Sequence, residues 1–141
     1  MDDPFNLGRF VLAQDDGRTY DRAVAELRDG RKRSHWMWFV FPQVAGLGHS
    51  AMAQRYAISG LDEARAYVSH PLLGPRLRTA AAALLGLPGS DAVAVLGGID
   101  AQKLRSSMTL FARSAPDEPV FREVLERYFG GGEDEVTLAR L

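Results

Sequence analysis

The chain has 141 residues, of which 46% are hydrophobic and 25% are charged, a composition typical of one soluble globular domain and not of a disordered or fibrous chain. Its 17 basic and 18 acidic residues leave a formal net charge of -1, which argues against a dedicated nucleic-acid or anionic-membrane protein. The absence of cysteine excludes disulfides, thiolate nucleophiles and cysteine-ligated metal sites.

The charge at the start of the chain and the length of its apolar runs indicate where the protein is located. Asp2 and Asp3 make the start of the chain acidic, whereas a secretory signal would be basic. The longest apolar runs fall far short of the roughly 20 residues that span a bilayer. We therefore expect a cytoplasmic protein with no membrane partner, and we expect residues 1–141 to fold as a single domain because no repeat or long linker interrupts them.

Apolar residues recur at helical spacing along most of the chain, which predicts a mainly α-helical protein. Gly30 would end the second helical segment, and the glycines at 130–132 would end the last long one. The spacing is clearest in three sets: Leu7, Phe10 and Val11; Tyr20, Val24 and Leu27; and Val120, Phe121, Val124, Leu125 and Tyr128.

Two short helices are predicted in the middle of the chain. Ser59 and Asp62 have the spacing of a capping box with aspartate in place of glutamate, and the helix that they open would end before Pro71. The alanine-rich residues 73–87 have strong helix propensity, and Pro75 is compatible with a helix there only in its first turn.

The segment 36–41 is apolar at every position, so it shows neither a helical nor a strand period. We favour a buried central helix ended by Pro42, with a strand paired to residues 91–96 as the alternative. Trp36 and Trp38 should both be largely buried in either case. The expected fold class is therefore all-α, a compact bundle of about seven or eight short helices with at most one minor strand pair.

Residues 46–51 read Gly-Leu-Gly-His-Ser-Ala, which fits a variant of the dinucleotide-binding fingerprint. The fingerprint should open directly after a strand and be followed by alternating strands and helices, and neither condition is met here. We therefore interpret the segment as a glycine-rich turn in which Ser50 caps the next helix.

A basic run, residues 31–33, stands just before His35 and the two tryptophans. Cations beside aromatic rings can hold a phosphate and stack on a base, although a basic run alone is usually a solvated loop. Because this is the one such cluster in a chain of near-zero net charge, a small phosphorylated ligand is a better fit than nucleic acid. For His35, a half-buried structural role outweighs a catalytic or ligand-contacting one.

A second polar cluster lies on the predicted helix 101–113, which Asp100 could cap. Helical spacing places Lys103 on one face with Ser106 and Ser107, at the border of the buried stripe. A Ser–Lys nucleophile is less favoured than ligand contacts, and both are less favoured than capping and a surface ion pair, because the order Lys-x-x-Ser is not diagnostic.

These two clusters give the candidate site, a pocket where residues 31–38 meet residues 100–109. The main hypothesis is a protein or enzyme that binds a small phosphorylated, nucleotide-like metabolite; the alternative is a non-catalytic module that binds a protein partner. A closed pocket would favour the first hypothesis and an open apolar patch the second. No cofactor, metal ligand set or catalytic residue is assigned. The hypothetical ligand-binding residues are Arg33, His35, Trp36, Trp38, Lys103, Ser106 and Ser107.

Several sequence blocks together resemble one bacterial family over nearly the whole chain. The blocks are Asp3-Pro4-Phe5-Asn6-Leu7, Arg9-Phe10, His35-Trp36-Met37-Trp38-Phe39, Phe41-Pro42-Gln43, Gly46-Leu47-Gly48, His70-Pro71, Leu73-Gly74 and residues 103–111. They are similar to the domain-of-unknown-function family eighteen-ten, often labelled calpastatin. The resemblance implies a small, mainly α-helical fold and no established activity. The calpastatin label conflicts with the composition, because inhibitor chains of that kind are disordered.

Overall fold

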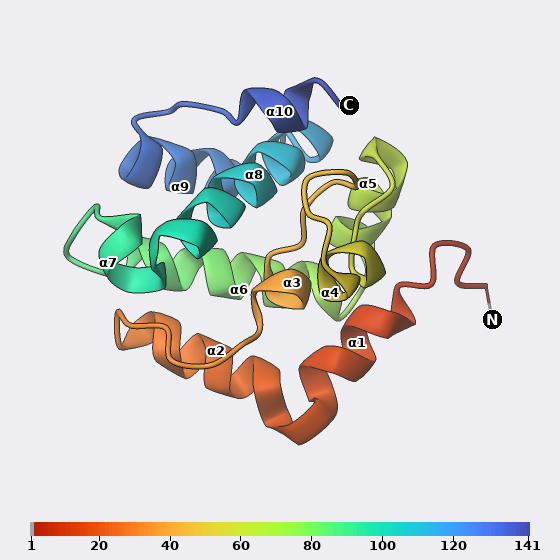
Figure 1. Cartoon of the computed structure of the whole chain (residues 1–141), viewed down its shortest axis with the longest axis horizontal. Helices are drawn as coiled ribbons and strands as arrows, with labels where there is room; N and C mark the ends of the chain where they lie inside the picture. The colour runs from red at the N-terminus through yellow and green to blue at the C-terminus, as the bar shows by residue number, and fades with distance from the viewer. Residues whose placement is uncertain (1) are drawn as a thin grey trace.

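The computed structural model describes residues 2–141, and in this part of the chain the segments with helical spacing are helices (Figure 1). The all-α fold class is confirmed. Residues 2–141 contain more helices than the expected seven or eight, because the chain also forms short helices of four or five residues, namely α3, α4, α7 and α10. The elements are α1 (Gly8–Asp15), the 3-10 helix η1 (Asp16–Arg18), α2 (Thr19–Arg28), α3 (Met37–Val40), α4 (Ala51–Arg55), α5 (Leu61–Ser69), α6 (Leu73–Leu85), α7 (Ala92–Leu96), α8 (Gly98–Ser114), α9 (Pro119–Phe129) and α10 (Glu135–Leu138).

The ambiguous aromatic segment forms a single helical turn, α3, as favoured from the sequence. The alternative strand pair with residues 91–96 is wrong, because α7 occupies that segment and the Asp91 side chain accepts a hydrogen bond of 3.1 Å from Ala94 N. Within residues 2–141 the β structure is limited to an isolated parallel bridge between Val44 and Ile58.

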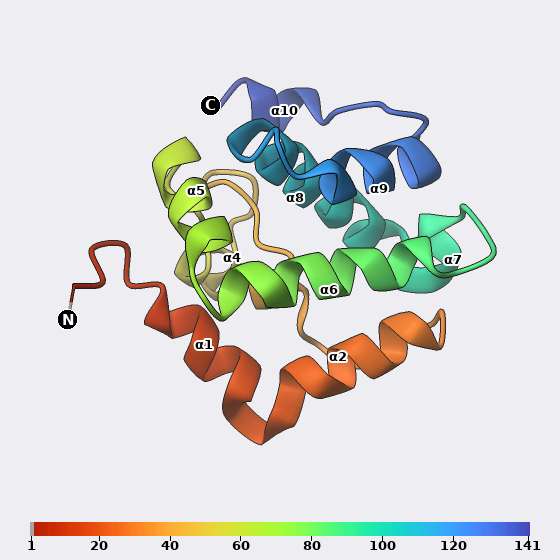
Figure 2. The same ribbon diagram turned by 180° about the vertical axis from the view of Figure 1, so that it is seen from behind.

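The core forms around α8 and α6, which lie in the middle of the molecule. Helix α8 contacts α5, α7, α9 and α10, and its fully buried Phe111 packs against the rings of Tyr67 and Phe121 at centroid distances of 5.4 and 5.7 Å. Seen from behind, α6 crosses the molecule between α2 and α9 (Figure 2). Among residues 2–141, no helix is both long and apolar enough to cross a bilayer.

Most of the predicted helix ends are confirmed. Pro75 lies in the first turn of α6, where its missing N–H costs nothing, and Gly130 ends α9 with a left-handed φ of 60°. Ser50 caps α4 by accepting a hydrogen bond of 3.1 Å from Ala53 N.

The predicted capping box at the start of α5 is wrong in its acidic partner. Gly60 is the N-cap residue and makes no side-chain cap, and Asp62 forms an exposed ion pair with Arg65. Glu63 takes the expected role instead, since one of its carboxylate oxygens accepts from Ser59 N at 2.9 Å and from Ser59 Oγ at 2.8 Å. Glu63 is buried, and Arg9 donates a hydrogen bond to its other carboxylate oxygen, which holds the side chain within reach of Ser59.

Candidate functional site

An open groove with a volume of about 630 Å³ runs along one face of α8; we call it the α8 groove. Its first wall is a stripe of that helix, its second wall belongs to residues 43–53, and its third wall is Asp134 with Val136 at the start of α10. Two of the predicted site residues, Lys103 and Ser106, lie on the first wall. The α8 stripe consists of Gly98, Ile99, Gln102, Lys103 and Ser106.

A smaller hollow of about 220 Å³ adjoins the α8 groove; we call it the aromatic hollow because Trp38 and Tyr56 line it. The two hollows share Gln43, Gly48 and Ala53 as lining residues. Trp38 is half-buried, so part of its indole ring is available to a molecule in this hollow.

Lys103 supplies a partly compensated positive charge on the α8 groove, beside the tryptophan that lines the aromatic hollow. Its Nζ lies 5.2 Å from the centroid of the Trp38 ring and 3.8 Å from Asp100 Oδ1. The same carboxylate is already engaged by Lys32, whose Nζ lies 2.9 Å from Asp100 Oδ2. Because one carboxylate serves two ammonium groups, Lys103 keeps the capacity to bind a further anion.

Ser106 faces the groove but its hydroxyl is committed to the protein. Ser106 Oγ lies 2.9 Å from Asp134 Oδ2, and the same carboxylate accepts hydrogen bonds from Thr137 Oγ1 at 2.5 Å and from Gln102 Nε2 at 3.2 Å. Asp134 also caps α10 by accepting from Thr137 N. Through this hydrogen bond to Asp134, the serine links α8 to α10.

Ser107 does not join Ser106 on the groove wall. It is fully buried, and within residues 2–141 its hydroxyl has no hydrogen-bond partner. Neither serine forms a hydrogen bond with Lys103 in the described part of the chain, so the arrangement lacks the geometry of a Ser–Lys dyad.

Trp36 is held in the core by a hydrogen bond to a buried carboxylate, so its ring is not accessible to a ligand. The indole is fully buried, and its Nε1 donates a hydrogen bond of 2.9 Å to Glu26. Glu26 also accepts from Arg33 N at 2.8 Å, from Ser34 N at 3.0 Å and from Ser34 Oγ at 2.6 Å. Burial acts to raise the pKa of Glu26, but these hydrogen bonds outweigh it and lower the pKa to about 2.

The same network corrects the expectation for His35. Glu26 draws the backbone of residues 33 and 34 and the Trp36 indole inward, and His35 between them is left exposed instead of half-buried. Arg33 forms an exposed ion pair with Asp29. Neither side chain lines the two hollows.

Residues 31–38 meet α8 at Trp38, whose ring lies beside Lys103, and at a second junction formed by Lys32. Lys32 closes that junction through its ion pair with Asp100 and through a backbone hydrogen bond of 2.8 Å from Lys32 N to Val95 O. Of the predicted site residues, Lys103 and Ser106 line the α8 groove and Trp38 lines the adjoining hollow, while residues 43–53 lie opposite α8. Gln43, His49 and Asp134 also line the groove, although the sequence patterns did not assign them to the site. Gln43 lies in one of the blocks that resemble the family, and His49 lies in the glycine-rich segment 46–51.

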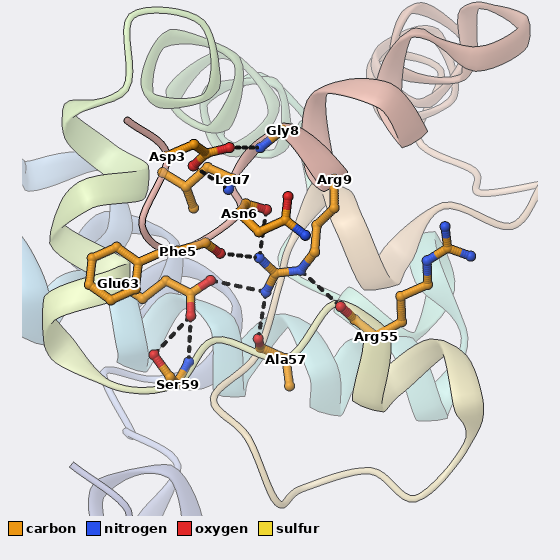
Figure 3. Close-up of polar contacts among 10 residues, drawn as sticks. All are labelled: Asp3, Phe5, Asn6, Leu7, Gly8, Arg9, Arg55, Ala57, Ser59 and Glu63. Carbon is orange, nitrogen blue, oxygen red and sulfur yellow. Dashed lines mark hydrogen bonds and ion pairs between the residues drawn. The ribbon is translucent and has the colours of Figure 1, made fainter. Parts of the chain in front are cut away.

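The wall that carries Tyr56 is held in place by Arg9, whose side chain reaches across from α1 (Figure 3). The guanidinium donates to Arg55 O and Ala57 O, both at 2.8 Å, on either side of Tyr56, and it forms an ion pair of 3.0 Å with Glu63. Its remaining donors reach Phe5 O and Asn6 O. All five donors of Arg9 are used, so this arginine positions the site and leaves no capacity for a ligand.

No three side chains among the histidines, aspartates and glutamates of residues 2–141 are arranged to hold a metal ion. His49 stands alone and exposed on the groove's second wall, and His70 caps the start of α6, because its Nδ1 accepts from Leu72 N and Leu73 N at 3.1 Å each.

The fold and the two hollows define a small all-α protein with an open groove lined by Lys103 and an adjoining hollow lined by the half-buried Trp38. The chain belongs to the family described as "Protein of unknown function (DUF1810)", whose model matches residues 4–141. It is similar to the conserved hypothetical protein Rv1873 from Mycobacterium tuberculosis, whose crystal structure has a TM-score of 0.95 and 52% identity over 99% of this chain and 98% of that chain. A comparison with curated proteins gives no match. The expected family is thereby confirmed, and neither description states an activity.

Proposed function

We propose that the protein binds a small phosphorylated metabolite in the α8 groove, with a phosphate on Lys103 and a flat, nucleotide-like ring in the aromatic hollow. The observation that carries this proposal is the shared carboxylate of Asp100, which leaves the Lys103 ammonium without a full counter-charge on the wall of the α8 groove. The half-buried Trp38 beside it offers a ring for stacking.

The polar groups around Lys103 support ligand binding more than catalysis. Asp134 and Ser106 are saturated with hydrogen bonds, and His49 has no hydrogen-bonding partner for its ring among residues 2–141. The proposal is therefore ligand binding, and no catalytic residue is assigned. The cytoplasmic location and the single-domain organisation stay predictions.

The test is a thermal-shift screen of nucleotides and sugar phosphates, followed by titration of tryptophan fluorescence. A ligand at 100 times its dissociation constant should stabilise the protein by about 2.7 kcal/mol. Lys103→Gln should weaken binding about tenfold or more and should also remove most of its salt dependence. Arg18→Gln is the matched control, because it removes one cation from an exposed ion pair with Asp21, and it should leave the affinity unchanged.

A second function is favoured by one specific observation, the exposed apolar side chains at the edge of the same groove. Ile99 is 78% exposed and Val136 is 58% exposed, and both line the α8 groove. Such paired side chains are typical of a surface that binds a protein segment. If the metabolite panel produces no thermal or fluorescence change, and Ile99→Ser with Val136→Ser abolishes capture of a protein partner, the interaction module replaces the metabolite site.

A further inference from the structure

The side chain of Arg140 lies directly against Gly46, one of the residues that line the aromatic hollow. A Cβ at position 46 would overlap the Arg140 guanidinium. Gly46 also has a φ of 96°, a backbone conformation that side chains rarely permit. The glycine therefore allows the guanidinium to pack on the bare backbone of the hollow's wall.

Arg140 reaches Gly46 from the opposite wall of the α8 groove. Its backbone N–H donates a hydrogen bond of 3.0 Å to Thr137 O, and Thr137 is buried and bonded to Asp134. Asp134 in turn lines the groove. The backbone of Arg140 is thus anchored on the third wall while its side chain lies on the second, so the residue connects the two.

The guanidinium of Arg140 has no acceptor within residues 2–141. Across residues 2–141 it forms no hydrogen bond or ion pair with another side chain or carbonyl, and the residue is exposed. Arg9 in the same molecule shows the contrast, because all five of its donors are used. A guanidinium that is held by packing and keeps its donors free presents a planar fork to a carboxylate or a phosphate.

We infer that the ligand carries two separated anionic groups, one bound by Lys103 and the second by Arg140. This inference rests on the proposed function and names its ligand class, a bisphosphate or a comparable metabolite with two anions. Lys103 lines the α8 groove, Arg140 packs on the wall of the aromatic hollow, and the two hollows join at Gln43 and Gly48. Asp100 compensates Lys103 only in part because it is shared with Lys32, and Asp134 on the groove wall is engaged by its hydroxyl and amide donors.

The experiment compares matched ligands by calorimetric titration of the full chain: adenosine monophosphate against adenosine bisphosphate, and fructose monophosphate against fructose bisphosphate. In the unmodified protein the bisphosphate of at least one pair should bind about tenfold more tightly than its monophosphate. Arg140→Gln should abolish that difference by weakening the bisphosphate to about the affinity of its monophosphate. Lys103→Gln should weaken both ligands, and Arg18→Gln should weaken neither. Gly46→Ala, which would displace the Arg140 side chain, should reproduce the effect of Arg140→Gln if it folds.

The outcomes separate the two proposals. If the monophosphates bind through Lys103, but the bisphosphates bind no more tightly or Arg140→Gln changes nothing, the two-anion inference is wrong and the proposed function stands. If neither member of either pair binds, or Lys103→Gln has no effect on binding, the proposed function is wrong and the inference falls with it.

Discussion

The two tryptophans differ in burial, and we therefore expect them to contribute differently to the free energy of unfolding. Trp36 is fully buried and hydrogen-bonded to Glu26, so Trp36→Ala should lower the free energy of unfolding by about 3–5 kcal/mol. Trp36→Phe keeps an aromatic ring in the core but removes one of the hydrogen-bond donors to the Glu26 carboxylate. It should lower the free energy of unfolding by about 1–3 kcal/mol. Trp38→Ala should cost less than Trp36→Ala, because Trp38 is only half-buried. Urea unfolding measures all three, and equal costs for the two alanine variants would contradict the assignment.

Two neighbouring serines on α8 provide a second contrast between residues. Ser107→Ala removes a buried hydroxyl that has no partner in residues 2–141, so it should be neutral or stabilising by up to about 1 kcal/mol. Ser106→Ala removes a donor from the buried carboxylate of Asp134 and should destabilise by about 1–3 kcal/mol. The two variants serve as mutual controls in chemical denaturation, and a destabilising Ser107→Ala would show that its hydroxyl has a bound partner.

At the level of the elements, one arginine ties α1 to the segment that precedes α5. Arg9→Lys keeps the charge but loses the planar fork, and an ammonium group cannot reach four carbonyls and Glu63 at once. We expect a loss of about 2–4 kcal/mol in unfolding free energy, with faster amide hydrogen exchange at residues 55–59. Unchanged stability and exchange in Arg9→Lys would show that the network is dispensable.

Helices were predictable from the sequence where local signals decide them, and the site was predictable only in part. Proline in the first turn of α6, Ser50 before α4 and Gly130 after α9 act within one helical turn, so sequence spacing identified them. The acidic partner of Ser59 could not be chosen in this way, because Arg9, distant along the chain, holds Glu63 in place. The same limit applies to His35, whose exposure depends on the contacts that Glu26 makes with its neighbours.

At the scale of the whole molecule, the groove is made by segments far apart in the sequence. Lys103 and Ser106 could be paired from helical spacing alone, whereas the opposing wall at 43–53 and the third wall at Asp134 are brought to α8 by the packing of the complete chain. No local sequence pattern predicts that the side chains of Ile99 and Val136 are exposed to solvent, because their exposure depends on how the complete chain packs.

The stability of the whole molecule should fall in acid, chiefly through Glu26. Its pKa is lowered from the ordinary value of 4.5 to about 2 in the folded protein. A hydrogen bond from Arg113 lowers the pKa of Glu133, and hydrogen bonds from the backbone of Gly8 and Leu7 lower the pKa of Asp3. A lowered folded pKa contributes stability above the unfolded value, and that stability is lost as the pH falls toward the folded one. The contribution of Glu26 to the unfolding free energy should therefore be fully present above about pH 5 and should be lost progressively between pH 4.5 and about 2.

Glu26→Gln isolates this effect, because it removes the titrating group and retains an oxygen that can accept. The variant should be less stable than the unmodified protein at pH 7, by about 2–4 kcal/mol, since four donors lose a charged acceptor. Its stability should also change less between pH 5 and about 2, so the two curves should converge in acid. Urea unfolding at a series of pH values measures both curves, and parallel curves would show that Glu26 is not the main source of acid sensitivity.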